Sequence, residues 1–181
     1  MIGTTLHWVN GPWLGKLALA ARPRGGEWLE DEISGWRRAG INAIVSLLTP
    51  EEEHDLGLNN EASEAQVHGL KFLSLPVEDR GVPERESDVR ANVAQVNNLL
   101  SQGENVVIHC RQGVGRTGLL GACLLVSQGI APDNAVSMLS SARGVPVPET
   151  PEQRRWINQF ASTVTNPTRM TFAGSLSEKR R

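Results

Sequence analysis

The chain of 181 residues lacks several features that would place it outside the cell, in a membrane or on nucleic acid. Its two cysteines cannot form a disulfide framework, and reduced thiols fit a cytoplasmic location. Its 18 basic and 20 acidic residues leave a formal net charge of −2, without the basic excess of a general nucleic-acid or membrane-surface binder. No apolar run reaches the ~18–20 residues of a membrane span. No secretory signal is expected at the first residues, because no basic segment precedes an apolar one there.

What the chain contains is an alternation of strand and helix patterns within the length of one domain. Continuous apolar runs predict buried strands, and apolar residues spaced three and four apart predict helices. Strands are expected at 6–9, 16–21, 41–48, 70–77 and 105–109. Helices are expected at 28–39, from Pro50 behind Thr49, at about 61–68, around the stripe Val89, Val93, Val96 and Leu100, and at 117–127, 132–143 and 151–164.

Strands separated by helices predict an α/β fold, with a mostly parallel central sheet flanked by helices. Residues 1–164 are expected to form the domain. Residues 165–181 are polar and lack periodicity, so they are expected to form a mobile tail.

The most informative segment is 106–118, in which a buried strand runs into a glycine loop that opens an apolar helix. Gly113 and Gly115 permit a backbone path that a Cβ would obstruct. Such a path can turn successive N–H groups inward, and the helix behind it adds its positive N-terminal dipole. Arg116 at the helix start offers a planar fork that matches two phosphate oxygens. The segment therefore predicts a binding site for a phosphate group.

Cys110 lies at the end of that strand, beneath the same N–H groups. A thiolate at this position is stabilised by the helix dipole and by a hydroxyl such as that of Thr117. Because the thiolate is the nucleophilic form of cysteine, the loop is predicted to bind a phosphate and to hold a nucleophile beneath it.

The run His-Cys-X5-Arg-Thr at residues 109–117 resembles the signature of the cysteine-dependent protein tyrosine and dual-specificity phosphatases. The resemblance covers roughly residues 6–160 and is closest to the compact branch of the kinase-associated phosphatase type. It implies the phosphotyrosine phosphatase-like fold. It also implies that Cys110 attacks phosphorus and forms a phosphocysteine, while Arg116 and the loop amides stabilise the equatorial oxygens. The phosphate-binding residues that it implies are Arg111, Gln112, Gly113, Val114, Gly115 and Arg116.

The resemblance further implies a general acid, an aspartate on a movable loop about thirty residues before the cysteine. The pattern Pro-X-X-Asp-X-X-X-Pro at 76–83 places Asp79 in that role, and Glu78 and Asp88 are weaker candidates. Asp79 would later act as base on the hydrolytic water. Gln153 is a candidate for orienting that water, but the capping pattern of its helix also explains this residue.

Supporting roles are expected for His109, Thr117 and Gln153. His109 is interpreted as a buried, hydrogen-bonded support of the loop, with proton donation as the alternative. Cys123 lies inside the apolar helix, where core packing is favoured over a role as redox partner of Cys110. The four histidines show no metal-ligand spacing, and no metal or organic cofactor is implied.

The predicted function is that of a monomeric, cytoplasmic enzyme that hydrolyses phosphotyrosine, and also phosphoserine or phosphothreonine, on proteins. No nucleic-acid or membrane partner is expected. The chain contains no tyrosine, whereas phosphotyrosine-specific members of the resembled superfamily use a tyrosine-bearing loop to line a deep slot. A shallower dual-specificity pocket is therefore favoured. The alternatives are phosphoinositides, other small phosphorylated molecules or RNA 5′ ends as substrates, and a non-catalytic phosphate-binding module.

Overall fold

Five short strands form one sheet in the computed structural model, which describes residues 3–165. The strands are β1 (His7–Val9), β2 (Leu17–Ala21), β3 (Ala43–Ser46), β4 (Lys71–Ser74) and β5 (Val106–Cys110). Their spatial order is β1-β2-β5-β3-β4. β1 pairs antiparallel with β2 and the other neighbours pair in parallel, which confirms the prediction of a mostly parallel sheet.

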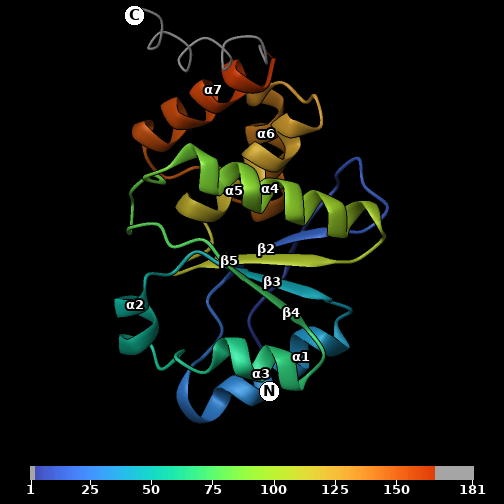
Figure 1. Cartoon of the computed structure of the whole chain (residues 1–181), viewed down its shortest axis with the longest axis vertical. Coiled ribbons are helices and arrows are strands. Elements are labelled where there is room, and N and C mark those ends of the chain that lie inside the picture. The colour runs from blue at the N-terminus through green and yellow to red at the C-terminus, as the bar shows by residue number, and fades with distance from the viewer. Residues whose placement is uncertain (1–2, 166–181) are drawn as a thin grey trace, which may run out of the picture.

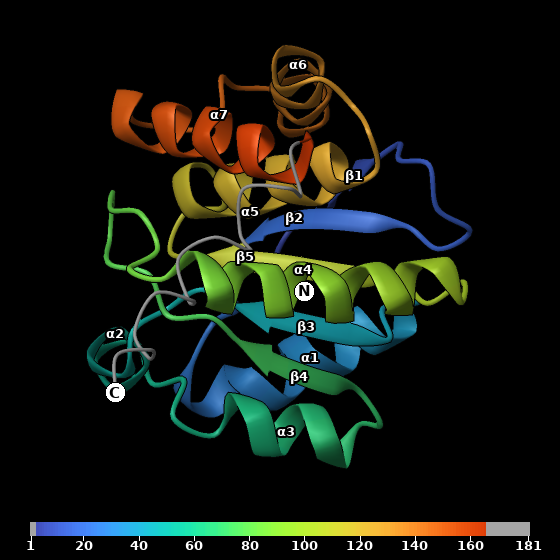
Figure 2. The ribbon, with the colours of Figure 1, turned by 45° about the horizontal axis from the view of Figure 1, so that its top comes forward.

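Helices cover both faces of this sheet. They are the short 3₁₀ helix η1 (Gly26–Trp28), α1 (Leu29–Arg38), α2 (Pro50–Asp55), α3 (Glu61–Val67), α4 (Glu86–Ser101), α5 (Gly115–Ser127), α6 (Pro132–Arg143) and α7 (Pro151–Thr165). Figures 1 and 2 show α4 to α7 on one face of the sheet and α1 and α3 on the other. Among the described residues, no helix combines the length and the apolar character needed to cross a membrane.

The central strand β5 leads directly into the glycine loop and is held on both sides. It pairs with β2 on one side and with β3 on the other, and all of its residues are buried. Val106, Ile108 and Cys110 pack into the core beneath α4 to α7, whereas Val107 packs into the core beneath α1 and α3. Because both faces of β5 are covered, its residues are apolar at every position except His109 and do not alternate between apolar and polar.

The predicted elements are present, with small differences at their ends. α5 begins at Gly115, two residues before the predicted start, so Arg116 is already helical. β4 covers only part of the predicted 70–77, because Pro76 has no N–H to donate to a neighbouring strand. α7 continues to Thr165, and residues 166–181 of the predicted tail lie outside the described residues.

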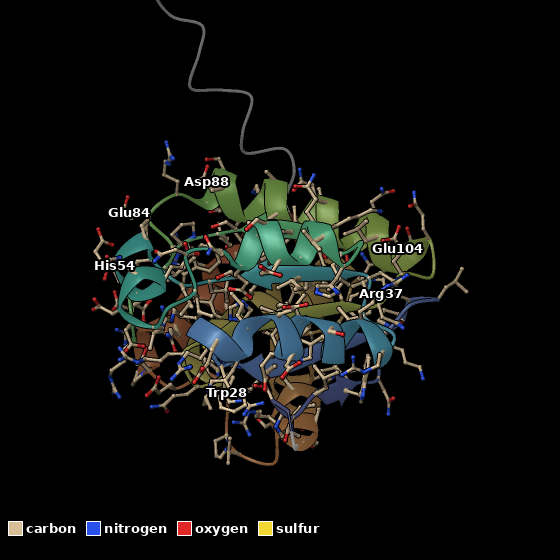
Figure 3. All side chains as sticks on the ribbon, turned by 90° about the horizontal axis from the view of Figure 1, so that it is seen from below. Trp28, Arg37, His54, Glu84, Asp88 and Glu104 are labelled. Atoms are coloured by element: carbon tan, nitrogen blue, oxygen red, sulfur yellow. The ribbon has the colours of Figure 1, made fainter. Side chains whose placement is uncertain are left out.

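The carboxyl ends of the parallel strands define the edge of the sheet at which the functional loops meet. α2 follows β3 at this edge, and the segment between β4 and α4 follows β4 (Figures 1 and 2). Figure 3 shows His54 of α2 and Glu84 of the β4–α4 segment at one end of the molecule, with Arg37 and Glu104 at the other. The fold therefore brings three sequence segments together around the end of β5.

Candidate active site

The loop between β5 and α5 folds around the sulfur of Cys110. Cys110 is 3% exposed, and the Gly113 N–H donates a hydrogen bond to its Sγ at 3.3 Å. Gly113 has a φ of +69°, and a Cβ at this position would lie 2.4 Å from the carbonyl carbon and oxygen of Ala20 in β2. Only glycine fits where the loop crosses the end of β2. The structure thus places the sulfur beneath an inward-facing amide.

The N-terminus of α5 adds further hydrogen-bond donors beside the sulfur. Val114 occupies the N-cap position, and its side chain makes no capping hydrogen bond. The N–H groups of the first helical turn have no intrahelical partners, and the helix dipole there favours a negative charge. Arg111 and Gln112 in the same loop are exposed. An anion seated over Cys110 would therefore find donors in the loop and at the start of α5.

Arg116 is buried beside the loop, and its guanidinium is held from several directions. Its Nη1 donates to Glu52 Oε2 at 2.6 Å and its Nη2 donates to Glu52 Oε1 at 3.0 Å, which makes a bidentate ion pair. Nη1 also donates to the carbonyls of Leu47 and Val77, at 3.3 and 2.8 Å. Burial by itself lowers the pKa of Arg116, but the hydrogen bond to Glu52 and the nearby negative charges raise it above its ordinary value. The guanidinium is therefore a fixed and permanently charged group.

Glu52 is a site residue that the sequence analysis did not assign. It belongs to the capping box of α2, in which the Thr49 N–H donates to Glu52 Oε2 at 3.1 Å and the Glu52 N–H donates to Thr49 Oγ1 at 3.3 Å. Burial of its carboxylate opposes ionisation, but hydrogen bonds from Arg116 and Thr49 outweigh this and lower the pKa of Glu52. The capping pattern is visible in the sequence. Nothing local indicates that the same carboxylate reaches Arg116, 64 residues later.

Asp79 meets Arg116 at the edge of the site. Its Oδ1 lies 2.9 Å from Arg116 Nη2, and its side chain is 53% exposed. The weaker candidates have other surroundings: Glu78 is exposed, and Asp88 is paired with Arg85 at 2.9 Å. Both line a neighbouring cleft of about 290 Å³. Of these three carboxylates, Asp79 is the one that contacts Arg116 in the described part of the chain.

Two contacts tie the segment after β4 to the start of α7. Arg80 Nη1 donates to Glu149 Oε1 at 2.8 Å, and Gln153 Nε2 donates to the Gly81 carbonyl at 2.9 Å. Gln153 is fully buried, and its Oε1 accepts from the N–H groups of Glu149 and Thr150 at 3.1 and 3.2 Å. Because both ends of its amide are engaged in this way, the geometry favours the capping interpretation of Gln153 over a role in orienting water.

His109 lies behind the loop and away from solvent. It is fully buried, its Nε2 lies 2.9 Å from Glu61 Oε1 without the alignment of a hydrogen bond, and its ring lies 5.8 Å from that of Trp36. The predicted hydrogen bonding of His109 is therefore not formed, because neither ring nitrogen has a hydrogen-bond partner among the described residues. Its complete burial still favours a supporting role over proton donation. The Thr117 hydroxyl is also buried and has no hydrogen-bond partner among the described residues, so its expected contact with the sulfur is not formed in this structure.

In the part of the chain that the structure describes, neither Cys123 nor the metal-ligating residue types form a second chemical centre. Cys123 is fully buried in α5, and burial raises its pKa well above the ordinary value, which favours core packing over reactivity. Both cysteines are free. Within residues 3–165, no group of three His, Cys, Asp or Glu side chains is placed to hold a metal ion.

The arrangement of this loop agrees with a comparison to known protein families. The family model described as "Polymorphic toxin system, DSP-PTPase phosphatase" matches residues 19–130. The chain belongs to this family. The matched DSP-PTPase region extends from β2 to beyond α5, so it contains Cys110, Arg116, Asp79 and the unforeseen Glu52.

Two curated relatives and one solved structure show how far the similarity of this DSP-PTPase chain extends. Cyclin-dependent kinase inhibitor 3 of Rattus norvegicus is 27% identical over 134 residues, which cover 73% of this chain and 63% of the relative. Tyrosine-protein phosphatase non-receptor type 18 of Homo sapiens is 34% identical over 115 residues, which cover 55% of this chain and 24% of the relative. A crystal structure of kinase associated phosphatase, with serine in place of its catalytic-site cysteine, matches with a TM-score of 0.80 and 21% identity, covering 91% of this chain and 98% of that one.

These comparisons show the phosphatase fold, and the individual residue roles stay predictions. The chain spans 59–63% of the length of the cyclin-dependent kinase inhibitor 3 proteins of rat, human and pig. The activity and substrates of the whole protein are therefore proposals.

Proposed function

We propose that this DSP-PTPase chain is a protein phosphatase that hydrolyses phosphotyrosine, and also phosphoserine and phosphothreonine, through a phosphocysteine intermediate. The observation that carries the proposal is the convergence of a nucleophile, a cation and an acid. Cys110 Sγ accepts from the Gly113 N–H at 3.3 Å, and Asp79 lies 2.9 Å from Arg116 at the start of the same helix.

In the first step, the Cys110 thiolate attacks phosphorus from the side opposite the leaving oxygen. The S–P bond forms and the ester P–O bond breaks, while protonated Asp79 transfers its proton to the leaving alkoxide or phenoxide. The loop N–H groups and Arg116 stabilise the charge on the equatorial oxygens. In the ion pair with Arg116, Asp79 is a carboxylate and cannot yet act as an acid. The entering phosphate displaces it from Arg116 Nη2, and the released carboxylate takes up a proton from solvent before the P–O bond breaks.

In the second step, water attacks the phosphorus of the phosphocysteine. The Asp79 carboxylate accepts one proton from that water, the S–P bond breaks, and inorganic phosphate leaves. Cys110 is again a thiolate and Asp79 is again protonated, so the cycle is balanced. Glu52 holds Arg116 in one orientation throughout, because its bidentate pair fixes the plane of the guanidinium.

Relatives support a phosphoprotein as the substrate class. One of them is named as a tyrosine-protein phosphatase, and the matching crystal structure is of a kinase associated phosphatase. The chain itself contains no tyrosine, which favours a shallower pocket that also admits phosphoserine and phosphothreonine. The Arg111 side chain at the rim of the loop is 48% exposed, and its Nη1 lies 4.0 Å from Glu52 Oε1, so part of its positive charge is offset by Glu52.

Hydrolysis of an aryl phosphate in excess EDTA, with and without vanadate, tests the chemistry. We expect turnover without added metal, inhibition by vanadate, and loss of turnover in Cys110→Ser with retained binding of vanadate. Unchanged turnover in Cys110→Ser contradicts the proposal. A wild-type protein that binds vanadate but never turns over is a phosphate-binding module. Faster hydrolysis of inositol lipids than of phosphopeptides would move the substrate class to phosphoinositides.

We also infer that the protein acts in the cytoplasm as a monomer, without a nucleic-acid or membrane partner. Free cysteines support the cytoplasmic location, and the net charge of −2 supports the absence of a nucleic-acid or membrane-surface partner. Light scattering behind size exclusion should give a mass near 19.7 kDa, and twice that mass contradicts the monomer.

A further inference from the structure

Arg143, the last residue of α6, contacts the phosphate loop from its outer side. Its Nε donates to the carbonyl of Gly113 at 2.8 Å, and its Nη2 donates to the carbonyl of Gln112 at 3.1 Å. The sequence marks Arg143 only as a basic residue in the last turn of a helix. The contact joins residues 30 positions apart, so it exists only in the folded chain.

The two carbonyls that Arg143 binds belong to two consecutive peptide units of the loop, which carry the N–H groups of Gly113 and Val114. Both peptide bonds are trans, so the C=O and the N–H of each unit point in opposite directions. The carbonyl of Gln112 points to Arg143, and the N–H of the same unit, that of Gly113, points to Cys110 Sγ at 3.3 Å. By the same geometry, the Gly113 carbonyl bound by Arg143 turns the Val114 N–H toward the inner side of the loop.

Two other backbone hydrogen bonds anchor the neighbouring parts of the loop: the Arg22 N–H donates to the Arg111 carbonyl at 3.4 Å, and the Gly118 N–H donates to the Val114 carbonyl at 3.1 Å. Neither of these bonds holds the two peptide units that Arg143 binds. Gly113 has the conformational freedom of glycine and a left-handed φ of +69°. On one side it is in contact with the backbone of Ala20, and on the other with Arg143. Without the guanidinium, the units could rotate and carry their N–H groups away from the sulfur.

The charge of Arg143 acts in the same direction as its geometry. Within residues 3–165, Arg143 makes no ion pair with a carboxylate. His7 lies close to it, and after burial the charge of Arg143 is a cause of the lowered pKa of His7. A cation bound to a carbonyl polarises the peptide unit and strengthens its N–H as a donor. The guanidinium therefore also adds positive potential to the loop.

We propose that Arg143 is a positioning residue of the phosphate loop, which aims the N–H groups of Gly113 and Val114 at the thiolate and at the transferring phosphoryl group. It does not touch substrate and acts through two backbone carbonyls. The inference rests on the proposed phosphatase function, because it assigns a task to that loop.

The test compares Arg143→Met and Arg143→Lys with a matched control, Arg154→Met. Like Arg143, Arg154 is an arginine that binds a backbone carbonyl. It joins α7 to the start of α6, with bonds to Asp133 and to the Pro132 carbonyl, and these bonds do not involve the loop. Three quantities are measured: kcat/KM on an aryl phosphate, the Kd for vanadate, and the pH at which half of the maximal rate of Cys110 alkylation by iodoacetamide is reached. Unfolding midpoints are recorded for each variant.

Loss of a single oxyanion donor costs about 10²–10³ in rate, and here two donors are misdirected rather than removed, so we expect kcat/KM of Arg143→Met to fall about 10–100-fold. Vanadate binding should weaken about tenfold, and the midpoint of alkylation should move to higher pH. Arg143→Lys keeps the positive charge and can donate to one of the two carbonyls, so it should recover part of each loss. Arg154→Met should stay near wild type.

Two results would overturn the positioning role. One is wild-type vanadate affinity and alkylation midpoint in Arg143→Met. The other is equal losses in Arg143→Met and Arg143→Lys that follow the fraction of unfolded protein. Neither result bears on the proposed function, which instead fails if the wild-type protein does not turn over.

Discussion

Replacing Glu52 by glutamine tests whether the carboxylate beneath Arg116 holds the active site together. Glu52 is 13% exposed and the Arg116 side chain 1% exposed, so the pair is nearly dry. Glutamine keeps the shape of the side chain. Its amide oxygen can take the place of Oε2, which serves both the Thr49 N–H and Arg116 Nη1. Its NH₂ group then replaces Oε1 and faces Arg116 Nη2, so a donor meets a donor.

The size of the effect follows from what remains around Arg116. Removing one partner of a buried ion pair costs about 3–5 kcal/mol, and a hydrogen bond to a charged group contributes about 1.5–3 kcal/mol. Glu52→Gln retains one of the two bonds, and the carbonyls of Leu47 and Val77 still accept from the guanidinium. We therefore expect a loss of about 2–3 kcal/mol in the free energy of unfolding, equivalent to a fall of about 5–10 °C in Tm for a domain of this size. With Arg116 less well oriented, kcat/KM should fall about 10–100-fold.

The pH dependence of the stability difference between wild type and Glu52→Gln has a predicted direction, which can be checked. The pKa of Glu52 is lowered in the folded protein, so its carboxylate stabilises the fold fully above the pKa it has when unfolded. That contribution is lost as the pH falls through the lowered, folded pKa. The difference in unfolding free energy between wild type and Glu52→Gln should thus be largest near neutral pH and shrink on acidification.

The free energy of unfolding is measured by chemical denaturation at a series of pH values, and kcat/KM is measured by steady-state kinetics on an aryl phosphate. Glu51→Gln is the matched control, since Glu51 is exposed and lies in the same first turn of α2. An unfolding free energy of Glu52→Gln within about 0.5 kcal/mol of that control, together with unchanged kcat/KM, would refute the assigned role. So would a difference that grows on acidification.

Two further predictions concern the loop and the acid. Gly113→Ala places a Cβ 2.4 Å from the Ala20 carbonyl at a φ of +69°, so it should abolish most activity. Gly129→Ala shares a positive φ, +86°, but meets no atom within 4 Å, so it should lose only about 1–2 kcal/mol of stability and keep its kcat; equal kinetics in the two variants contradict the steric argument. Asp79→Asn should slow turnover about 10²–10⁴-fold for poor leaving groups and much less for good ones, and should flatten the basic side of the pH–rate curve. Equal losses across leaving groups move the acid role to another residue.

The sequence alone was sufficient for the parts of the protein whose causes are local. The strand, the glycine loop and the start of α5 are one continuous segment, so the placement of Cys110, the loop amides and Arg116 next to one another could be predicted from their spacing. The capping boxes of α2 and α7 and the largely apolar β5 likewise depend on neighbouring residues or on burial from both sides. For the same reason the layered α/β architecture was predictable, since it follows from the periodicity of each segment.

Only the tertiary structure decided which distant side chains complete the site. Asp79 was one of three candidate carboxylates, and it is the contact with Arg116 across 37 residues that distinguishes it. Glu52 and Arg143 were missed, because they approach Arg116 and Gly113 from 64 and 30 residues away and leave no local signal of that task. Parallel strands align their carboxyl ends at one edge of the sheet, and the loops that follow them meet only there. Contacts between such loops depend on the register of the strands and the packing of the helices, which no single segment contains.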